Sequence, residues 1–166
     1  MTGLLKRADA ASRSSQYTGE NMIRKFVTAM SIIAMLVLSG CASVPMASKN
    51  DDAMAKQFRP STDKAVVYVY RNETMGAAIK MPLLIDGQSV GDTAAKTYLR
   101  RELAPGSHTI VSKTEEDSTL TLDMQAGKTY FVWQEVKMGM FAARSALHQV
   151  DETKGRAAIE KCTLIL

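Results

Sequence analysis

The hydrophobic and polar positions divide the chain into one continuous apolar run near the N-terminus and a series of short runs after residue 63. The later runs are rich in β-branched and aromatic residues and are separated by Gly, Pro and Asp, a pattern typical of short β-strands. Lys64–Arg71 is apolar on both faces, which predicts a buried central strand. In Thr119–Met124 apolar and polar residues alternate strictly, which predicts a strand with one buried face.

Further strands are expected at 78–85, 97–103, 108–113, 129–136, 162–166 and, more weakly, 146–150, and the chain restarts briefly at 90–92. Pro82 lies inside one of them and therefore predicts an edge strand or a bulge. Asp151–Lys161 is expected to form a short helix capped by Asp151, weakened by Gly155. Seven to eight short strands at this spacing indicate a mainly all-β domain, either a small barrel or, as we expect, a single antiparallel β-sandwich with one short C-terminal helix.

The continuous apolar run, Phe26–Leu38, follows the cations Arg24 and Lys25. As a helix it would span roughly 20 Å, which is short of the ~30 Å hydrocarbon core of a bilayer. The run is therefore expected to be a signal-peptide helix and not a membrane anchor.

The next residues, Leu38-Ser39-Gly40-Cys41, resemble a bacterial lipobox. Small residues before the cysteine suit a peptidase cleft, and the thiol accepts a diacylglyceryl group. The resemblance implies recognition by a signal peptidase through Leu38, Ser39 and Gly40, cleavage before Cys41, and covalent diacylglycerol and N-acyl lipid on Cys41. No other cofactor is expected. Two or three acyl chains anchor a protein far more firmly than one.

Four segments follow from this prediction. Residues 1–21 are polar and read as a mis-started extension before a true start at Met22, 22–40 as the lipoprotein signal peptide, 41–63 as a tether and 64–166 as the β-sandwich domain. Within the tether, 51–58 could form two helical turns that pack Met54 and Phe58 on the domain. The lipobox resemblance also implies a destination. In lipoproteins of enteric-type bacteria, Asp directly after the lipidated cysteine favours retention in the inner membrane, so Ala42 at this position points to the outer membrane, facing the periplasm.

The charge supports this division. The whole chain carries 21 Lys and Arg against 17 Asp and Glu, a net charge of +4. Residues 1–40 hold five of the cations and only two of the acids, so residues 41–166 carry a net charge of +1. The basic character belongs largely to the leader, and no nucleic-acid partner is expected.

Four turn-rich motifs resemble one family. They are Val-Tyr-Val-Tyr-Arg at 67–71, Ile-Asp-Gly-x-x-Val-Gly at 85–91, Leu-x-Pro-Gly-x-His-x-Ile at 103–110 and Ala-Gly-Lys-x-Tyr at 126–130. Together they are similar to small all-β bacterial lipoproteins of the family named domain of unknown function 2846, and the middle part is similar to PEGA-type surface modules. The resemblance implies a β-sandwich and assigns no catalytic residues.

Candidate chemistry is sparse. His108 is expected to be a strand residue beside a turn, and Cys162 a small buried hydrophobic residue. No nucleophile elbow or phosphate-binding loop is present, so we do not expect an enzyme. Thioether and imidazole ligands suit Cu(I), which leaves Met138, Met140 and His148 as a weak alternative metal site.

The expected function is a non-catalytic binding or adaptor module for an envelope protein partner, held at the membrane by its lipid. Two loops are the candidate interaction surfaces: Asn72–Ala77, with Asn72 and Met75, and Lys137–Arg144, with Met138, Met140, Phe141 and Arg144. Two alternatives stay open. One is an outer-membrane anchoring component of a secretion or envelope assembly, and the other is a periplasmic small-ligand or copper binder.

Overall fold

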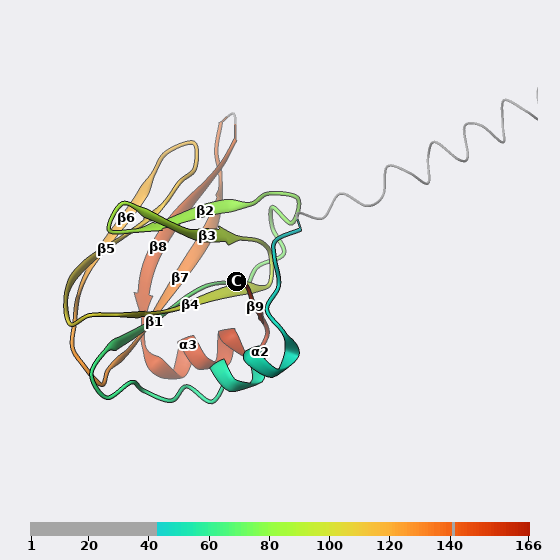
Figure 1. The fold of residues 1–166 in the computed structure, drawn as a ribbon. Helices are drawn as coiled ribbons and strands as arrows, with labels where there is room; N and C mark the ends of the chain where they lie inside the picture. Colours follow the sequence, from blue (N-terminus) through green and yellow to red (C-terminus); the bar gives the residue numbers. More distant parts are fainter. Residues whose placement is uncertain (1–42, 141) are drawn as a thin grey trace, which may run out of the picture. The chain divides into compact units, whose positions relative to one another are not determined.

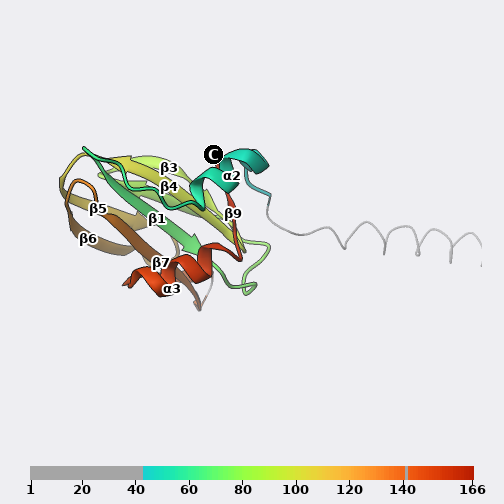
Figure 2. The ribbon, with the colours of Figure 1, turned by 90° about the horizontal axis from the view of Figure 1, so that it is seen from below.

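The computed structural model describes residues 43–140 and 142–166. Their elements are, in order, α2 (Lys49–Ala55), β1 (Ala65–Arg71), β2 (Met81–Ile85), β3 (Gln88–Thr93), β4 (Thr97–Leu103), β5 (Gly106–Ser112), β6 (Ser118–Met124), β7 (Thr129–Met138), β8 (Ala143–Val150), α3 (Glu152–Ile159) and β9 (Thr163–Leu164). The strands form two stacked sheets, and both helices cover the outer face of one of them (Figures 1 and 2). The predicted all-β sandwich with a short C-terminal helix is confirmed.

The larger sheet has the order β8-β7-β1-β4-β9, and the smaller has the order β3-β2-β5-β6. β1 lies at the centre of the larger sheet, and all seven of its residues are buried, as its apolar pattern predicts. Its even-numbered side chains face the helices and its odd-numbered ones face the second sheet, because side chains alternate along a strand.

Contrary to expectation, the strands do not all pair antiparallel. β1 runs parallel to β7, and β4 runs parallel to β9. The cause is the path of the chain: it leaves β6 through the turn at Gln125–Lys128 and returns beside the start of β1. Gly127 N donates to Lys64 O there, and Val66 N donates to Lys128 O. β7 therefore begins at the same end of the sheet as β1 and runs in the same direction.

Two smaller predictions, the irregularity at Pro82 and the helix cap at Asp151, can also be compared with the structure. The register between β2 and β3 shifts at Leu83 and Leu84, next to Pro82, so the expected irregularity is a bulge. β2 is an inner strand of its sheet and not an edge. Asp151 caps α3 as predicted, since its carboxylate accepts a hydrogen bond from Lys154 N at 2.9 Å.

The core has two main layers that differ in composition. Between the sheets it is largely aliphatic, with Ala65, Val67, Val69, Leu83, Ile85, Ile110, Leu122, Met124, Val132 and Leu147. Under the helices it is largely aromatic, with Phe58, Tyr68, Tyr70, Tyr98 and Phe131 among its members. Tyrosines suit the second layer, because the helices and loops there offer carbonyl groups to their hydroxyls.

The segment expected to be a tether is largely folded onto the domain over its described length. Val44 and Phe58 are both 5% exposed, and Met46 pairs with Ile165 as an isolated bridge. Phe58 packs in the core as predicted, whereas Met54 points outward at 59% exposure, contrary to expectation. The helix ends at Ala55, so Met54 and Phe58 do not share one helical face.

Candidate interaction surfaces

A buried arginine fixes the first predicted loop. Arg71, at the end of β1, is fully buried, and its guanidinium donates to the carbonyl oxygens of Ile79 at 2.8 Å, Met75 at 2.9 Å and Gly76. Burial lowers the pKa of Arg71, opposed by the negative charge of Glu73. The loop thus folds around the guanidinium of Arg71. Met75, at the tip of the loop, is half exposed.

Gly76 is needed for this arrangement. Its φ of 65° lies in the left-handed region, and a Cβ there would come within 3.1 Å of Arg71 Nη2. The carbonyl of Asn72 accepts a hydrogen bond from Lys96 Nζ, which ties the start of the loop to the β3–β4 turn.

The second predicted loop is the tip of the β7–β8 hairpin. The pairs Lys137–Arg144 and Met138–Ala143 keep the hairpin paired to its end. Met138 and Met140 are 83% and 79% exposed, the highest values among the described large hydrophobic residues. Glu115, from the β5–β6 loop, accepts from Arg144 Nε at 3.3 Å and braces the hairpin from the side. Phe141 lies outside the described residues.

The structure brings these two loops to the same end of the sandwich. A Cβ on Gly76 would contact Val136 of β7, so the first loop packs on the strand that carries the second. A shallow hollow of about 620 Å³ lies between Ile79–Met81, the β5–β6 loop and Ala142–Ala143. Sequence reasoning found both loops but could not show that they are neighbours, because that depends on the parallel pairing of β1 with β7.

A polar cluster lies buried between the sheets, and sequence reasoning missed it. Gln134 Nε2 donates to Ser112 Oγ at 2.6 Å, and Ser145 Oγ donates to the same atom at 2.7 Å. Thr93 Oγ1 lies within hydrogen-bond distance of Gln134 Oε1. Since Thr93, Ser112, Gln134 and Ser145 satisfy one another, the cluster joins the strands that they occupy and presents no reactive group to solvent.

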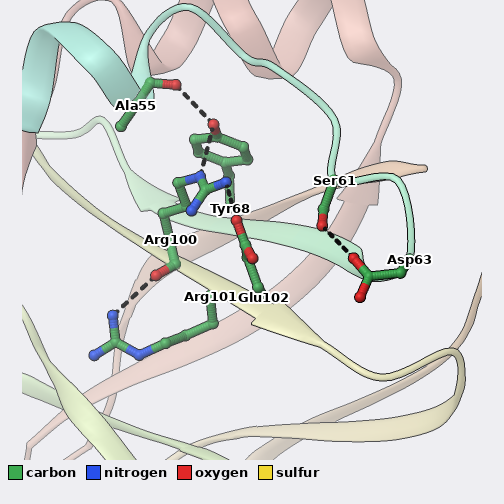
Figure 3. Close-up of polar contacts among 7 residues, drawn as sticks. All are labelled: Ala55, Ser61, Asp63, Tyr68, Arg100, Arg101 and Glu102. Atoms are coloured by element: carbon green, nitrogen blue, oxygen red, sulfur yellow. Dashed lines mark hydrogen bonds and ion pairs between the residues drawn. The ribbon is translucent and has the colours of Figure 1, made fainter. Parts of the chain in front are cut away.

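A second hollow, of about 590 Å³, lies on the outer face of the larger sheet between α2, β4 and residues 164–166. Figure 3 shows Tyr68, Arg100, Arg101 and Glu102, which are among the polar residues that line it. Tyr68 Oη donates to Ala55 O at 2.7 Å, and Arg100 Nε donates to Tyr68 Oη at 3.3 Å. Arg100 also pairs with Glu102 at 2.7 Å. Tyr68, Arg100 and Glu102 therefore satisfy one another, and Arg100 is not an unpaired cation aimed at a ligand.

Arg101 points the opposite way from Arg100, as expected for neighbours on a strand (Figure 3). Its guanidinium donates to Arg100 O at 2.9 Å and to Val90 O at 2.6 Å. It therefore connects the edge of β4 to the edge of β3 in the other sheet.

The alternative copper ligands are not brought together. His148 lies opposite Trp133 in the β7–β8 ladder, whereas Met138 lies five residues further along β7. That separation is roughly 17 Å along the strand. His148 Nε2 instead lies 2.9 Å from Glu135 Oε2, and its ring is tilted against that of Trp133, with the ring centroids 5.3 Å apart. Within the described residues, no group of three or more His, Cys, Asp or Glu side chains could hold a metal ion.

The other two candidate reactive residues have structural surroundings. Burial raises the pKa of Cys162 to about 11, so its thiol stays protonated. His108 contacts Asp86 Oδ2 at 2.6 Å and Ala104 O at 2.7 Å, and this contact joins two turns. Neither forms a nucleophile–base pair with another described residue.

The predicted lipidation motif, Leu38 to Cys41, lies outside the described residues. The compact unit that contains the sandwich runs from Cys41 to Leu166. In the described part of the chain, no helix has the length and apolar character needed to cross a membrane.

The fold and these surfaces define a small all-β domain that presents loops from a rigid sandwich. The family model described as "Protein of unknown function (DUF2846)" matches residues 61–146, so the chain belongs to this family. An uncharacterized protein of Haemophilus influenzae is 37% identical over 141 residues, which cover 84% of each chain. The family resemblance inferred from the turn motifs is therefore confirmed. Neither comparison indicates a catalytic activity.

Proposed function

We propose that this protein is a lipoprotein of the cell envelope, anchored by its lipid in the outer membrane and facing the periplasm. Its β-sandwich would be a non-catalytic adaptor for an envelope protein. The lipid anchor is supported by the agreement between two boundaries. The lipobox places the mature N-terminus at Cys41, and the compact unit that contains the sandwich also begins at Cys41. Cleavage there would release a complete domain and leave no part of it in the signal peptide.

The adaptor role rests on the β7–β8 hairpin. Met138 and Met140 form an exposed apolar tip, and Lys137 and Arg144 flank it with charge. An apolar centre with a charged rim is the usual composition of a protein-binding patch. The hairpin is paired to its end and braced by Glu115, so ordering it on binding would cost little conformational entropy.

The absence of a catalytic role is part of this proposal. His108, His148 and Cys162 each have structural contacts, and no two of them lie in a nucleophile–base arrangement among the described residues. We therefore expect no catalytic activity. The protein would act by holding a partner near the membrane.

The anchor is tested by growing cells on labelled palmitate. The parent chain should incorporate the label, and Cys41→Ser should incorporate none and should leave the membrane fraction. Cys162→Ser is the matched control, since Cys162 is buried and should not affect labelling. Label retained by Cys41→Ser would contradict the proposal.

The partner is tested by photo-crosslinking in cells from positions 138 and 140. We expect one dominant protein adduct, and none from the matched exposed position Thr121 on β6. Adducts with several subunits of one complex would indicate an assembly component. No adduct at either methionine position would contradict the adaptor role.

A further inference from the structure

We propose that the link between the lipid and the domain is too short to act as a tether, and that it holds one side of the sandwich directly against the lipid headgroups. The contacting surface, here named the anchor-side patch, consists of Met46, Met75, Ile79, Lys80 and Lys96. This inference rests on the proposed lipidation of Cys41 and adds where the domain sits and which face it turns to the membrane.

The domain is fixed to its N-terminal segment from Val44 onward. Val44 is buried against Ala94, Leu99 and Ile165. Backbone hydrogen bonds of 3.0 Å join Leu166 N to Pro45 O and Ala47 N to Leu164 O. These contacts attach the segment to the edge of the larger sheet, so it cannot extend without breaking the pairing with β9.

Only Ala42 and Ser43 separate Cys41 from Val44. Three residue steps reach at most about 10 Å even when fully extended. The headgroup layer on each side of a bilayer is roughly 5–8 Å thick. An acylated Cys41 therefore keeps Val44 within about one headgroup layer of the membrane surface.

The exposed large apolar side chains of the described residues avoid the end of the sandwich opposite the attachment point. The large ones are Met46, Met54, Met75, Ile79, Met138, Met140 and Leu166. The loop 72–80 lies at the end of the sandwich where residues 43–46 join it, and the turns at 86–87, 104–106 and 125–128 lie at the other end (Figures 1 and 2). None of these seven residues is in those three turns.

The patch is continuous with the point of attachment and is cationic. Ala94 packs on Val44, and Lys96, two residues later, donates to the Asn72 carbonyl of the loop. Lys80 and Lys96 are exposed and suit anionic headgroups. The acid of the loop, Glu73, turns inward, where its Oε1 accepts from the Trp133 indole at 2.7 Å.

The occupant of this surface is lipid and not a folded partner. A folded domain of about 100 residues has a radius of gyration near 13 Å. The link of about 10 Å leaves no room for such a body between the patch and the leaflet. A protein partner would therefore not bind the anchor-side patch. It would reach the tip of the β7–β8 hairpin, which is not part of that patch, from alongside the membrane.

The inference is tested with the full-length, acylated protein in vesicles of phosphatidylethanolamine and phosphatidylglycerol that contain a shallow doxyl-lipid quencher. A fluorescent label is placed on Met75→Cys, on Ile79→Cys and, as the matched control, on Gln125→Cys in the β6–β7 turn. Cys162 is 3% exposed and should not label, which the parent protein verifies. We expect several-fold stronger quenching at positions 75 and 79 than at position 125.

Insertion of ten Gly and Ser residues between Ser43 and Val44 gives the domain reach without altering it. With this spacer, quenching at position 75 should fall towards the value at position 125. Equal quenching at all three positions without the spacer, or quenching unaffected by the spacer, would overturn the inference. If the parent protein carries no lipid and does not float with the vesicles, the proposed function fails and the inference fails with it.

Discussion

The two helices cover the same face of the larger sheet, yet they are held in different ways. α3 lies so close that a Cβ on Gly155 would come within 2.3 Å of the Phe131 ring. α2 is held instead through polar contacts and one aromatic residue that follows it, Phe58. Tyr68 Oη donates to the Ala55 carbonyl, and Asp52 accepts a hydrogen bond from the Leu164 backbone at 2.8 Å.

This difference teaches why the sequence predicts helical turns at both places but does not predict how α2 is held. α3 has local signals, an Asp cap and a following strand. α2 has a cap from Ser48 but ends after seven residues, and its attachment depends on residues more than 100 positions away. Together with the contacts of Val44, Pro45 and Ala47, the docking of α2 would keep the proposed lipid anchor close to the domain.

The largest expected effect is the loss of α2 docking in Phe58→Ala. Phe58 contacts Tyr68 and Phe131 with ring centroids 5.4 and 6.0 Å away. Its φ of 51° is unfavourable by about 1–2 kcal/mol, a cost that its burial offsets. The free energy of unfolding should fall by about 3–5 kcal/mol, measured by urea denaturation of the domain with Trp133 fluorescence.

Met54→Ala is the control for this prediction, because Met54 is 59% exposed. Its effect should stay within about 0.5 kcal/mol. If both variants have equally small effects, the segment is a tether after all and α2 does not stabilise the domain.

The second prediction concerns the close contact of α3. Gly155→Ala would improve helix propensity by about 1 kcal/mol, but its Cβ cannot fit against Phe131 without moving the helix. We expect a net loss of about 1–3 kcal/mol in the free energy of unfolding. Ala157→Gly, at an exposed position of the same helix, should cost only about 0.5–1 kcal/mol. If Gly155→Ala were more stable than the parent protein, α3 would lie further from the Phe131 ring than the structure shows.

The third prediction uses the carboxylate that ties α2 to β9. Burial raises the pKa of Asp52, but hydrogen bonds from Lys56 and the Leu164 backbone lower it more, so the net shift is downward. A lowered folded pKa means that the stabilisation is complete above the ordinary carboxyl pKa of ~4 and is lost as the pH falls through the folded value. Asp52→Ala should therefore lower the free energy of unfolding by about 1–3 kcal/mol at pH 7.

The pH dependence gives this prediction its check. The difference in stability between the parent and Asp52→Ala should shrink when unfolding is measured below about pH 4. Asp123→Ala, an exposed position on β6, should show neither effect. A difference that is the same at pH 7 and pH 3 would mean that the charge of Asp52 does not hold α2.

The sequence predicts what depends on neighbours along the chain. A run that is apolar on both faces predicts β1, strict alternation predicts β6, and the Asp151 cap predicts α3. The candidate loops were found in the same way, from exposed small and apolar residues between strands. Each of these signals lies within about ten residues, so no knowledge of the topology is needed.

What the sequence does not predict depends on contacts between distant segments. Gly155 looks like a weak point in a helix, and only the position of Phe131 explains it. Arg71 looks like an ordinary strand end, yet it is the buried centre of the next loop. The groove beside Arg100 needs α2 and the last strand to meet over β4, and no local pattern indicates that meeting.

The smallest expected effect lies at the end of the sandwich opposite the point where residues 43–46 join it, and it serves to show that the larger effects belong to the helices. The two ring nitrogens of His108 face two acceptors, Asp86 Oδ2 and Ala104 O, so only the protonated imidazole can donate to both. The hydrogen bond with Asp86 raises the pKa of His108, against a smaller opposing effect of burial. A raised folded pKa gives stability that is complete below the unfolded value of about 6.5 and is lost as the pH rises through the folded value. His108→Ala should therefore reduce the free energy of unfolding by less than about 1 kcal/mol at pH 5, and by less again at pH 9, in the same urea experiment. A larger cost at pH 9 than at pH 5 would mean that the neutral ring joins the two turns, and that this end, unlike the docking of α2 through Asp52, does not depend on charge.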